Sequence, residues 1–344
     1  MPGHDLIVIG ASAGGIEALS ELVKDLPAEL PAAVFVAVHI PAHSKSTLPK
    51  ILGRRSVLPA LKPEDGEEIR PGRIYVAPPD RHLLIKRGFI HVVHGPRENG
   101  SRPAIDPLFR TAARAYGRRV IGVVLSGSLD DGTAGLIAIK KRGGLSIVQD
   151  PDEALYPGMP QSAIDNSEVD YILPVSEIGS TLARLAVQPV EEGGEAPMDD
   201  EMEMEADIAE LDMATLHSRE KPGRPSRFSC PQCQGVLWEI DDDDIIRFRC
   251  RVGHAYSPEA LLAEQSDSVE SALWAGLRAL EENGALMARM AKAMRDKGNK
   301  RSAARFDEQG DNALARAETL RRMILGRERM TAAETETRQE ASAD

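Results

Sequence analysis

The sequence lacks the long apolar run that a membrane-spanning helix needs. None of its apolar stretches approaches ~18 residues, and the opening Met1-Pro2-Gly3-His4-Asp5 lacks the basic region of a secretory signal. Cysteine is scarce, because the 344 residues include only three, too few for a disulfide framework. Membrane insertion and secretion are therefore not expected, and a reducing cytoplasm is the predicted compartment.

The chain also has no excess of basic residues. Its 42 Lys and Arg against 54 Asp and Glu give a formal net charge of −12. Residues 191–212 hold 11 of the acidic side chains and no basic one. Nucleic acid is therefore not expected as a partner, and the acidic block is interpreted as a solvated linker. With 42% hydrophobic and 28% charged residues, the chain has the composition of an ordinary globular protein.

Short apolar runs alternate with helix-like stretches over the first 190 residues. Near-continuous apolar runs are typical of strands buried on both faces, and the helical stretches suit crossovers between parallel strands. The pattern predicts an α/β fold with a doubly wound, mostly parallel sheet and an inserted β-hairpin at residues 83–92. The predicted strands are residues 6–9, 32–40, 74–77, 120–125, 145–148 and 171–173.

The rest of the chain differs in composition from this first domain. A helical pattern begins after Ser257-Pro258, which is typical of a helix start, and breaks at Lys297-Gly298-Asn299, which predicts an α-helical hairpin. The predicted organisation is a catalytic domain at residues 1–190, an acidic flexible linker at 191–226, a small cysteine module at 227–256, the helical hairpin at 257–330 and a disordered tail at 331–344.

The segment Gly10-Ala11-Ser12-Ala13-Gly14-Gly15 lies between a predicted strand and a predicted helix. It matches the G-x-S-x-G pattern of a nucleophile elbow, in which small residues allow a sharp turn that exposes the serine. The helix start offers backbone N–H groups to an anion. A phosphate-binding glycine loop has similar glycines after a first strand, so this alternative stays open on the motif alone.

Two further positions favour a catalytic serine. His39 ends the second predicted strand, and Asp130-Asp131 stand in a glycine-rich loop after the strand at 120–125. Parallel strands bring their carboxyl ends to one edge of the sheet. A lone histidine is more often structural, and adjacent acids often only cap a turn. Together with Ser12, however, they form a candidate triad, with Asp131 preferred to Asp130 as the acid.

These motifs, taken in order, resemble the catalytic domain of the chemotaxis protein-glutamate methylesterase (CheB) family. The resemblance covers roughly residues 4–190 and begins with the serine turn. Its other segments are His39-Ile40-Pro41-Ala42, Val76-Ala77-Pro78-Pro79-Asp80-Arg81-His82, Arg102-Pro103-Ala104-Ile105-Asp106-Pro107-Leu108-Phe109, Leu125-Ser126-Gly127, Asp131-Gly132, Gln149-Asp150 and Gly158-Met159-Pro160.

The resemblance implies hydrolysis of γ-glutamyl methyl esters on chemoreceptor-type proteins, and in some members deamidation of glutamine. It implies Ser12 as nucleophile, His39 as base and Asp131 as orienting acid. The backbone N–H groups of Ala13 and Gly14 are the candidate oxyanion donors. No cofactor is expected for catalysis. The strand that carries Ser12 begins near residue 5, so we do not expect the phospho-receiver domain that usually precedes this domain, nor the usual phosphorylation control within the chain.

The site departs from the family pattern at a few positions. Ala13 stands where threonine is common, and Gly127-Ser128-Leu129 where the family commonly has Gly-Met-Gly. These departures keep an alternative open, a catalytically silent adaptor that uses the same fold for signalling. Nucleotide binding is disfavoured, because Ser12 and His39 replace the glycine and the acid that such a site uses.

All three cysteines lie in one short window. Cys230 and Cys233 are followed by Cys250 and, four residues later, His254. Two such knuckles supply four ligands for a tetrahedral zinc ion, and four protein ligands predict a structural role. Ordinary reduced cysteines are the alternative, and a redox Cys-x-x-Cys is disfavoured because no thioredoxin-like βαβ unit surrounds it.

The helices predicted at residues 257–330 carry apolar stripes, including a cluster formed by Met287, Met290 and Met294. Such stripes usually pack against another helix, and methionines also suit adaptable interfaces. This segment is therefore the predicted element for homodimerisation or for binding a partner helix.

Overall fold

The computed structural model describes residues 3–44, 47–190, 198–212, 215, 223–241 and 245–341. A seven-stranded sheet forms its centre, and every neighbouring pair of strands in it is parallel, as predicted. The order of the strands across the sheet is β3 (Ala60–Leu61), β4 (Arg73–Val76), β2 (Ala33–Val38), β1 (Leu6–Ala11), β7 (Val120–Val124), β8 (Leu145–Gln149) and β9 (Tyr171–Leu173).

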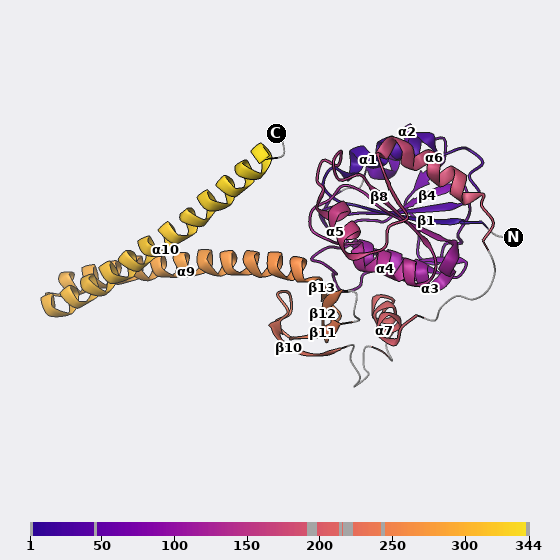
Figure 1. Ribbon diagram of the computed structural model, residues 1–344. Coiled ribbons are helices and arrows are strands. Elements are labelled where there is room, and N and C mark those ends of the chain that lie inside the picture. The colour runs from indigo at the N-terminus through magenta and orange to yellow at the C-terminus, as the bar shows by residue number, and fades with distance from the viewer. Residues whose placement is uncertain are drawn as a thin grey trace. The chain divides into compact units, whose positions relative to one another are not determined.

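Helices cover both faces of this sheet (Figure 1). One face carries α1 (Gly15–Leu22), α2 (Leu48–Arg55) and α6 (Val175–Ala186), and the other carries α3 (Ile105–Tyr116), α4 (Thr133–Lys141) and α5 (Gly158–Asn166). Two 3-10 turns, η1 (Val23–Asp25) and η2 (Gly117–Arg119), follow α1 and α3.

Strand β1 is apolar at every position because it is buried on both faces of the sheet. Ile7 and Ile9 join the core under α1, α2 and α6, whereas Leu6 and Val8 join the core under α3, α4 and α5. Successive side chains of a strand point to opposite faces, so a strand covered on both faces needs apolar residues at every position.

The predicted hairpin is present as β5 (His82–Lys86) and β6 (Phe89–Val93), and it forms a two-stranded sheet of its own. Leu83 and Ile85 are buried with the core that includes α3. The backbone N–H of Ile85 donates to Thr111 Oγ1 of α3 at 3.1 Å, which ties the hairpin to the helix.

Part of the segment 191–226, which was predicted to be a flexible linker, is folded in the structure. Helix α7 (Asp200–Ala209) lies within this range, capped by Asp199 Oδ1, which accepts from the N–H of Met202 at 2.7 Å. Glu205 is buried and pairs with Arg247 and Arg249 at 2.9 Å. Folding of this acidic segment is therefore stabilised by arginines distant in sequence. Residues 191–197, 213–214 and 216–222 of the predicted linker lie outside the described residues.

The cysteine module is a four-stranded antiparallel sheet of β10 (Arg224–Ser229), β11 (Val236–Asp241), β12 (Ile246–Cys250) and β13 (Ala255–Tyr256). Leu237, Phe248, Tyr256 and Leu261 pack with two of the cysteines in a small apolar cluster. This cluster is modest in size, so additional stabilisation by a metal fits the module well.

The chain divides into two compact units, Met1–Leu262 and Ala263–Asp344. Two long helices, α9 (Pro258–Asp296) and α10 (Lys300–Ala341), form the predicted hairpin around a turn at Gly298. Leu277, Ala317 and Ile324 pack between the two helices. Helix α10 continues past residue 330, where the disordered tail was predicted to begin, and residues 342–344 lie outside the described residues.

Among the residues that the structure describes, none of the helices combines the length and the apolar character needed to cross a bilayer.

Candidate active site and metal cluster

Ser12 lies on the turn between β1 and α1. Its N–H donates to the carbonyl of Ser126 at 2.9 Å, and its carbonyl accepts from the N–H of Gly15 at 3.0 Å. Gly14 has a φ of 71°, and a Cβ at this position would lie 2.7 Å from Ser126 Oγ. The tight turn therefore requires a glycine here, both for its left-handed backbone and for the space.

The start of α1 carries the candidate oxyanion donors. In the part of the chain that the structure describes, no hydrogen bond occupies the backbone N–H of Ala13 or Gly14. Unpaired N–H groups at a helix start favour negative charge. They are thus available to an oxyanion beside Ser12.

His39 follows β2, the strand next to β1 in the sheet, and meets Ser12 at the carboxyl edge of the sheet. Its Nδ1 lies 3.1 Å from Ser12 Oγ, and its Nε2 lies 2.7 Å from Asp131 Oδ2. An ionised Asp131 accepts from Nε2–H, so the lone pair of Nδ1 faces the serine hydroxyl. The histidine side chain remains 18% exposed, so part of the ring is accessible from solvent.

Asp131 lies in the loop between β7 and α4 and is 2% exposed. Its carboxylate also accepts from the N–H groups of Ile105 and Asp106 at the start of α3, at 2.7 and 3.3 Å, and from Asn99 Nδ2 at 2.9 Å. Burial raises the pKa of Asp131, but the hydrogen bonds from His39, Ile105 and Asn99 outweigh burial and bring the pKa to about 2. The group stays ionised at neutral pH.

The neighbouring Asp130 does not contact His39. It accepts a hydrogen bond of 2.7 Å from Ser257 Oγ, at the start of α9. Burial raises its pKa to about 6, and the bond from Ser257 opposes this only in part. The geometry therefore favours Asp131 over Asp130 as the acid next to the histidine.

Asp106 is a second buried acid beside the site. Its Oδ1 accepts from the N–H groups of Gly132 and Gly135 at 3.0 and 2.7 Å and so fixes the start of α4 to α3. Burial and the nearby charge of Asp131 raise its pKa well above the usual range. Asp106 lies in the segment 102–109 that resembles the family, but no sequence pattern indicated a function for it.

Two of the departures from the family pattern, Ser128 and Leu129, directly follow Gly127. A Cβ on Gly127 would fall 2.1 Å from Met159 Sδ and 2.9 Å from Ser12 Cβ. The buried Met159 of α5 thus packs against Gly127, which lies next to Ser12. Leu129 is 41% exposed and has a φ of 62°. This left-handed backbone conformation is unfavourable for a residue that has a β-carbon, and it suits the glycine that the family pattern has at this position.

A cleft of about 270 Å³ opens beside His39, and it provides the histidine with an approach from solvent. Its walls come from the segment after β2 and from the loop before α3. The lining residues are His39, Ile40, Pro41, Ala42, Arg97, Gly100, Ser101 and Arg102.

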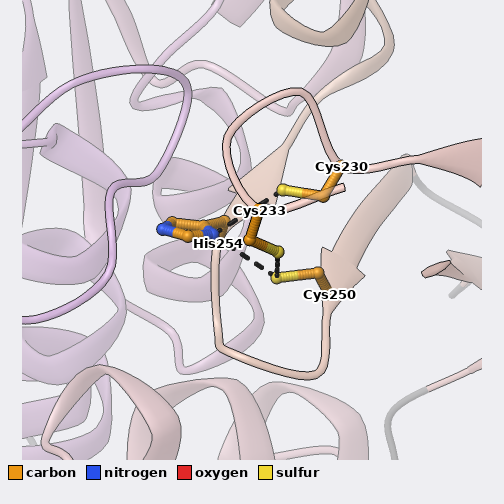
Figure 2. Close-up of side chains that lie close together, drawn as sticks. All are labelled: Cys230, Cys233, Cys250 and His254. Carbon is orange, nitrogen blue, oxygen red and sulfur yellow. Dashed lines mark hydrogen bonds between the residues drawn. The ribbon is translucent and has the colours of Figure 1, made fainter. Parts of the chain in front are cut away.

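The four predicted metal ligands come together in the cysteine module (Figure 2). The Sγ atoms of Cys230, Cys233 and Cys250 and a ring nitrogen of His254 all lie within 4.8 Å of one another. His254 Nδ1 lies 3.6 Å from Cys230 Sγ and 3.5 Å from Cys250 Sγ, and the sulfurs of Cys233 and Cys250 are 3.6 Å apart. A tetrahedral zinc with bonds of about 2.3 Å to sulfur has S···S edges of about 3.8 Å, so the cluster fits such an ion.

No sequence pattern indicated the contacts of Asn99. The amide of this residue bonds to both Asp131 and Asp106, at 2.9 and 3.1 Å. The Asn-Gly pair at residues 99–100 is an ordinary turn signal, and the φ of 49° at Asn99 agrees with a turn. The turn lies next to Asp131 because of tertiary packing, which a local sequence pattern does not encode.

A serine on a strand-to-helix turn, bonded to a histidine that is backed by a buried carboxylate, is the arrangement of serine hydrolases. The CheB methylesterase family model matches residues 7–182, and the chain belongs to this family. The matched residues end before the metal cluster.

Named relatives agree with this assignment. A putative protein-glutamate methylesterase/protein-glutamine glutaminase of Leptospira interrogans is 41% identical over 184 residues, which are 53% of this chain and 95% of that protein. A protein-glutamate methylesterase/protein-glutamine glutaminase of Pyrococcus abyssi is 36% identical over 198 residues, 56% of this chain and 54% of that protein. The chain therefore spans about half the length of the archaeal relative.

A solved structure supports the fold. The catalytic domain of Thermotoga maritima CheB methylesterase superposes with a TM-score of 0.52 at 35% sequence identity. The match covers 54% of this chain and 100% of that domain. The first compact unit thus contains a whole domain of this type.

Proposed function

We propose that the chain is a protein-glutamate methylesterase in which Ser12 is the nucleophile, His39 the general base and Asp131 the acid that orients the histidine. The observation that carries the proposal is the continuous chain of hydrogen bonds from Ser12 Oγ through both ring nitrogens of His39 to Asp131 Oδ2. The substrate class is a γ-glutamyl methyl ester on a chemoreceptor-type protein, in line with the names of the relatives.

Acylation begins when Ser12 Oγ attacks the ester carbonyl and His39 Nδ1 takes the hydroxyl proton. The negative charge of the tetrahedral intermediate moves to the former carbonyl oxygen, where the N–H groups of Ala13 and Gly14 donate to it. Collapse breaks the bond to the methoxy oxygen, which takes the proton from His39 and leaves as methanol. The ionised Asp131 stabilises the transient imidazolium.

Deacylation repeats these steps with water. His39 removes a proton from the water as its oxygen attacks the acyl-enzyme, and then returns the proton to Ser12 Oγ as the ester bond breaks. The product is the free γ-carboxylate of glutamate. A glutamine side chain passes through the same intermediates with ammonia as the leaving group, so deamidation is the proposed second activity.

The cysteine cluster is proposed to hold a structural zinc ion that makes no contact with the reacting ester. Cys230, Cys233, Cys250 and His254 fill all four positions of a tetrahedral ion, and such a closed site has no position for a substrate. The full chain purified without added metal is expected to contain about one equivalent of zinc. A folded module with less than a few tenths of an equivalent contradicts this assignment.

The helical hairpin is proposed as the element that binds a second copy or a partner helix. Leu262, Val269, Trp274, Leu286 and Met290 of α9 are exposed apolar side chains, which suits such contact. The proposed location is the cytoplasm, where methylated signalling segments of receptors are accessible.

Methanol release from a methylated receptor tests the esterase. Wild-type protein is expected to release methanol, and Ser12→Ala to retain the fold and lose turnover. A wild-type protein that binds the receptor but releases no methanol supports the silent adaptor instead. Unchanged turnover in Ser12→Ala contradicts the assignment of the nucleophile.

A further inference from the structure

The side chain of Asn99 joins the catalytic acid to the metal-binding module. Its Nδ2 donates to Asp131 at 2.9 Å and to Asp106 at 3.1 Å. Its Oδ1 accepts from the backbone N–H of Ser257, which follows β13 of the module, at 2.9 Å. A single amide thus bonds both to the proposed catalytic acid and to the residue that follows the last strand of the module.

The backbone of the Asn99 loop is paired with the same strand of the module. The N–H of Asn99 donates to the carbonyl of Ala255 at 2.8 Å, and the N–H of Ala255 donates to the carbonyl of Arg97 at 3.2 Å. Ala255 is the residue after the metal ligand His254. The loop behind the catalytic acid therefore lies one residue from the metal cluster.

Buried charges hold this contact together. Glu98, 3% exposed, accepts from Arg110 of α3 and from Arg249 of β12, both at 2.9 Å. Arg249 also donates to the carbonyl of Gly253 at 2.8 Å, inside the turn between the ligands Cys250 and His254. Charge-assisted bonds in a buried setting are strong and directional. The turn between Cys250 and His254 and the loop that carries Asn99 are therefore expected to move together.

Asp131 needs several donors to hold one orientation. Ile105 and Asp106 supply theirs from the start of α3 within the catalytic domain. The third donor is Nδ2 of Asn99, and contacts with the module hold Asn99 in place. Loss of this bond leaves Oδ1 with the longer 3.3 Å bond from the N–H of Asp106. The carboxylate is then less firmly oriented, and with it Oδ2, the atom that contacts His39.

We propose that Asn99 is a positioning residue for Asp131 and that the metal-loaded module supports the triad through it, so that metal content sets the rate of ester cleavage. This inference rests on the proposed triad. It assigns the module a role in the reaction although no atom of the module reaches Ser12 in the proposed steps.

The variant that tests the inference is Asn99→Gly. The φ of 49° at this residue is left-handed, so glycine removes the amide without straining the backbone. We expect kcat to fall ~10–100-fold with KM unchanged, because misplacement of a catalytic group slows the chemical step. Leu211→Gly makes a similar change at another left-handed residue, with a φ of 61°, and is expected to keep the wild-type kcat.

A spectroscopic readout separates positioning from a general loss of stability. The proton that His39 Nε2 shares with Asp131 gives a downfield NMR resonance. In Asn99→Gly this resonance is expected to shift or broaden while the fold is retained. An unchanged resonance together with wild-type kcat contradicts the role of Asn99.

Metal removal from the full chain tests the second half of the inference. Chelation, or Cys233→Ser, is expected to lower kcat and to change the same resonance as Asn99→Gly does. In Asn99→Gly, chelation is expected to lower kcat by less than twofold further, because the coupling is already broken. Equal losses upon chelation in wild type and in Asn99→Gly contradict coupling through this residue.

Ser12→Ala, assayed alongside, separates the two proposals. If Ser12→Ala keeps its turnover, the proposed function is wrong, whereas the resonance still tests the contact between Asn99 and Asp131. If Ser12→Ala is inactive and Asn99→Gly is unaffected in both readouts, only the further inference is wrong.

Discussion

His39 and Asp131 stand 92 residues apart in the chain, yet His39 Nε2 lies 2.7 Å from Asp131 Oδ2. The contact arises because β2 and β7 flank β1 in a parallel sheet and end at the same edge. The neighbouring Asp130 points to Ser257 instead, at 2.7 Å. Adjacent acids of one loop are therefore expected to have different roles.

Asp131→Asn is expected to lower kcat ~10⁴-fold with little change in the fold, because an amide no longer fixes the productive tautomer of His39. Asp130→Asn is the matched control, with an expected change in kcat below about fivefold. Steady-state methanol release measures both variants. A larger loss in Asp130→Asn than in Asp131→Asn contradicts the assignment of the acid.

Asp130 is also expected to make stability depend on pH. Its pKa is raised from 3.8 to about 6 in the folded chain, so protonated Asp130 stabilises the fold below pH 4, and this contribution is lost as the pH rises through 6. The loss is about 2–3 kcal/mol. Urea unfolding of wild type and Asp130→Asn at pH 4 and pH 7 measures it. A difference between the two proteins that is independent of pH contradicts the shift.

Leu129→Gly is expected to raise the free energy of unfolding by about 0.5–1 kcal/mol. Glycine relieves the left-handed backbone at Leu129, which costs about 1–2 kcal/mol, and loses part of this gain to the entropy of the unfolded chain. Leu155→Gly is the control. Leu155 is 69% exposed and lacks a positive φ, so glycine is expected to destabilise there. Thermal unfolding of both variants decides the sign.

The buried charges around Arg249 predict a large loss of stability. Arg249→Met leaves Glu98 and Glu205 with fewer partners in a buried setting, at a cost of about 3–5 kcal/mol. Arg278→Met removes an exposed ion pair with Glu282 and is expected to cost less than about 1 kcal/mol. Denaturant unfolding compares them, and similar losses in both variants contradict the account of the buried cluster.

The sequence predicted the parts of the fold that depend on local patterns. The unbroken apolar run of β1 predicted a strand covered on both faces, and its place beside the serine turn predicted the edge where Ser12 and His39 meet. The contacts of Asn99 and the folding of α7 against Arg247 and Arg249 were not predicted. Glu205 reads as one more charge in an acidic linker, and its partners Arg247 and Arg249 lie more than 40 residues away. Long-range pairing of this kind leaves no periodic signal.

Active-site labelling measures whether His39 activates Ser12. A fluorophosphonate reagent applied to the folded full chain, followed by peptide mass spectrometry, reports which serine reacts. We expect about one equivalent of label on the peptide that carries Ser12, and strongly reduced labelling in His39→Gln. Turnover of methylated receptor by a protein whose Ser12 stays unlabelled, or labelling that does not depend on His39, contradicts it.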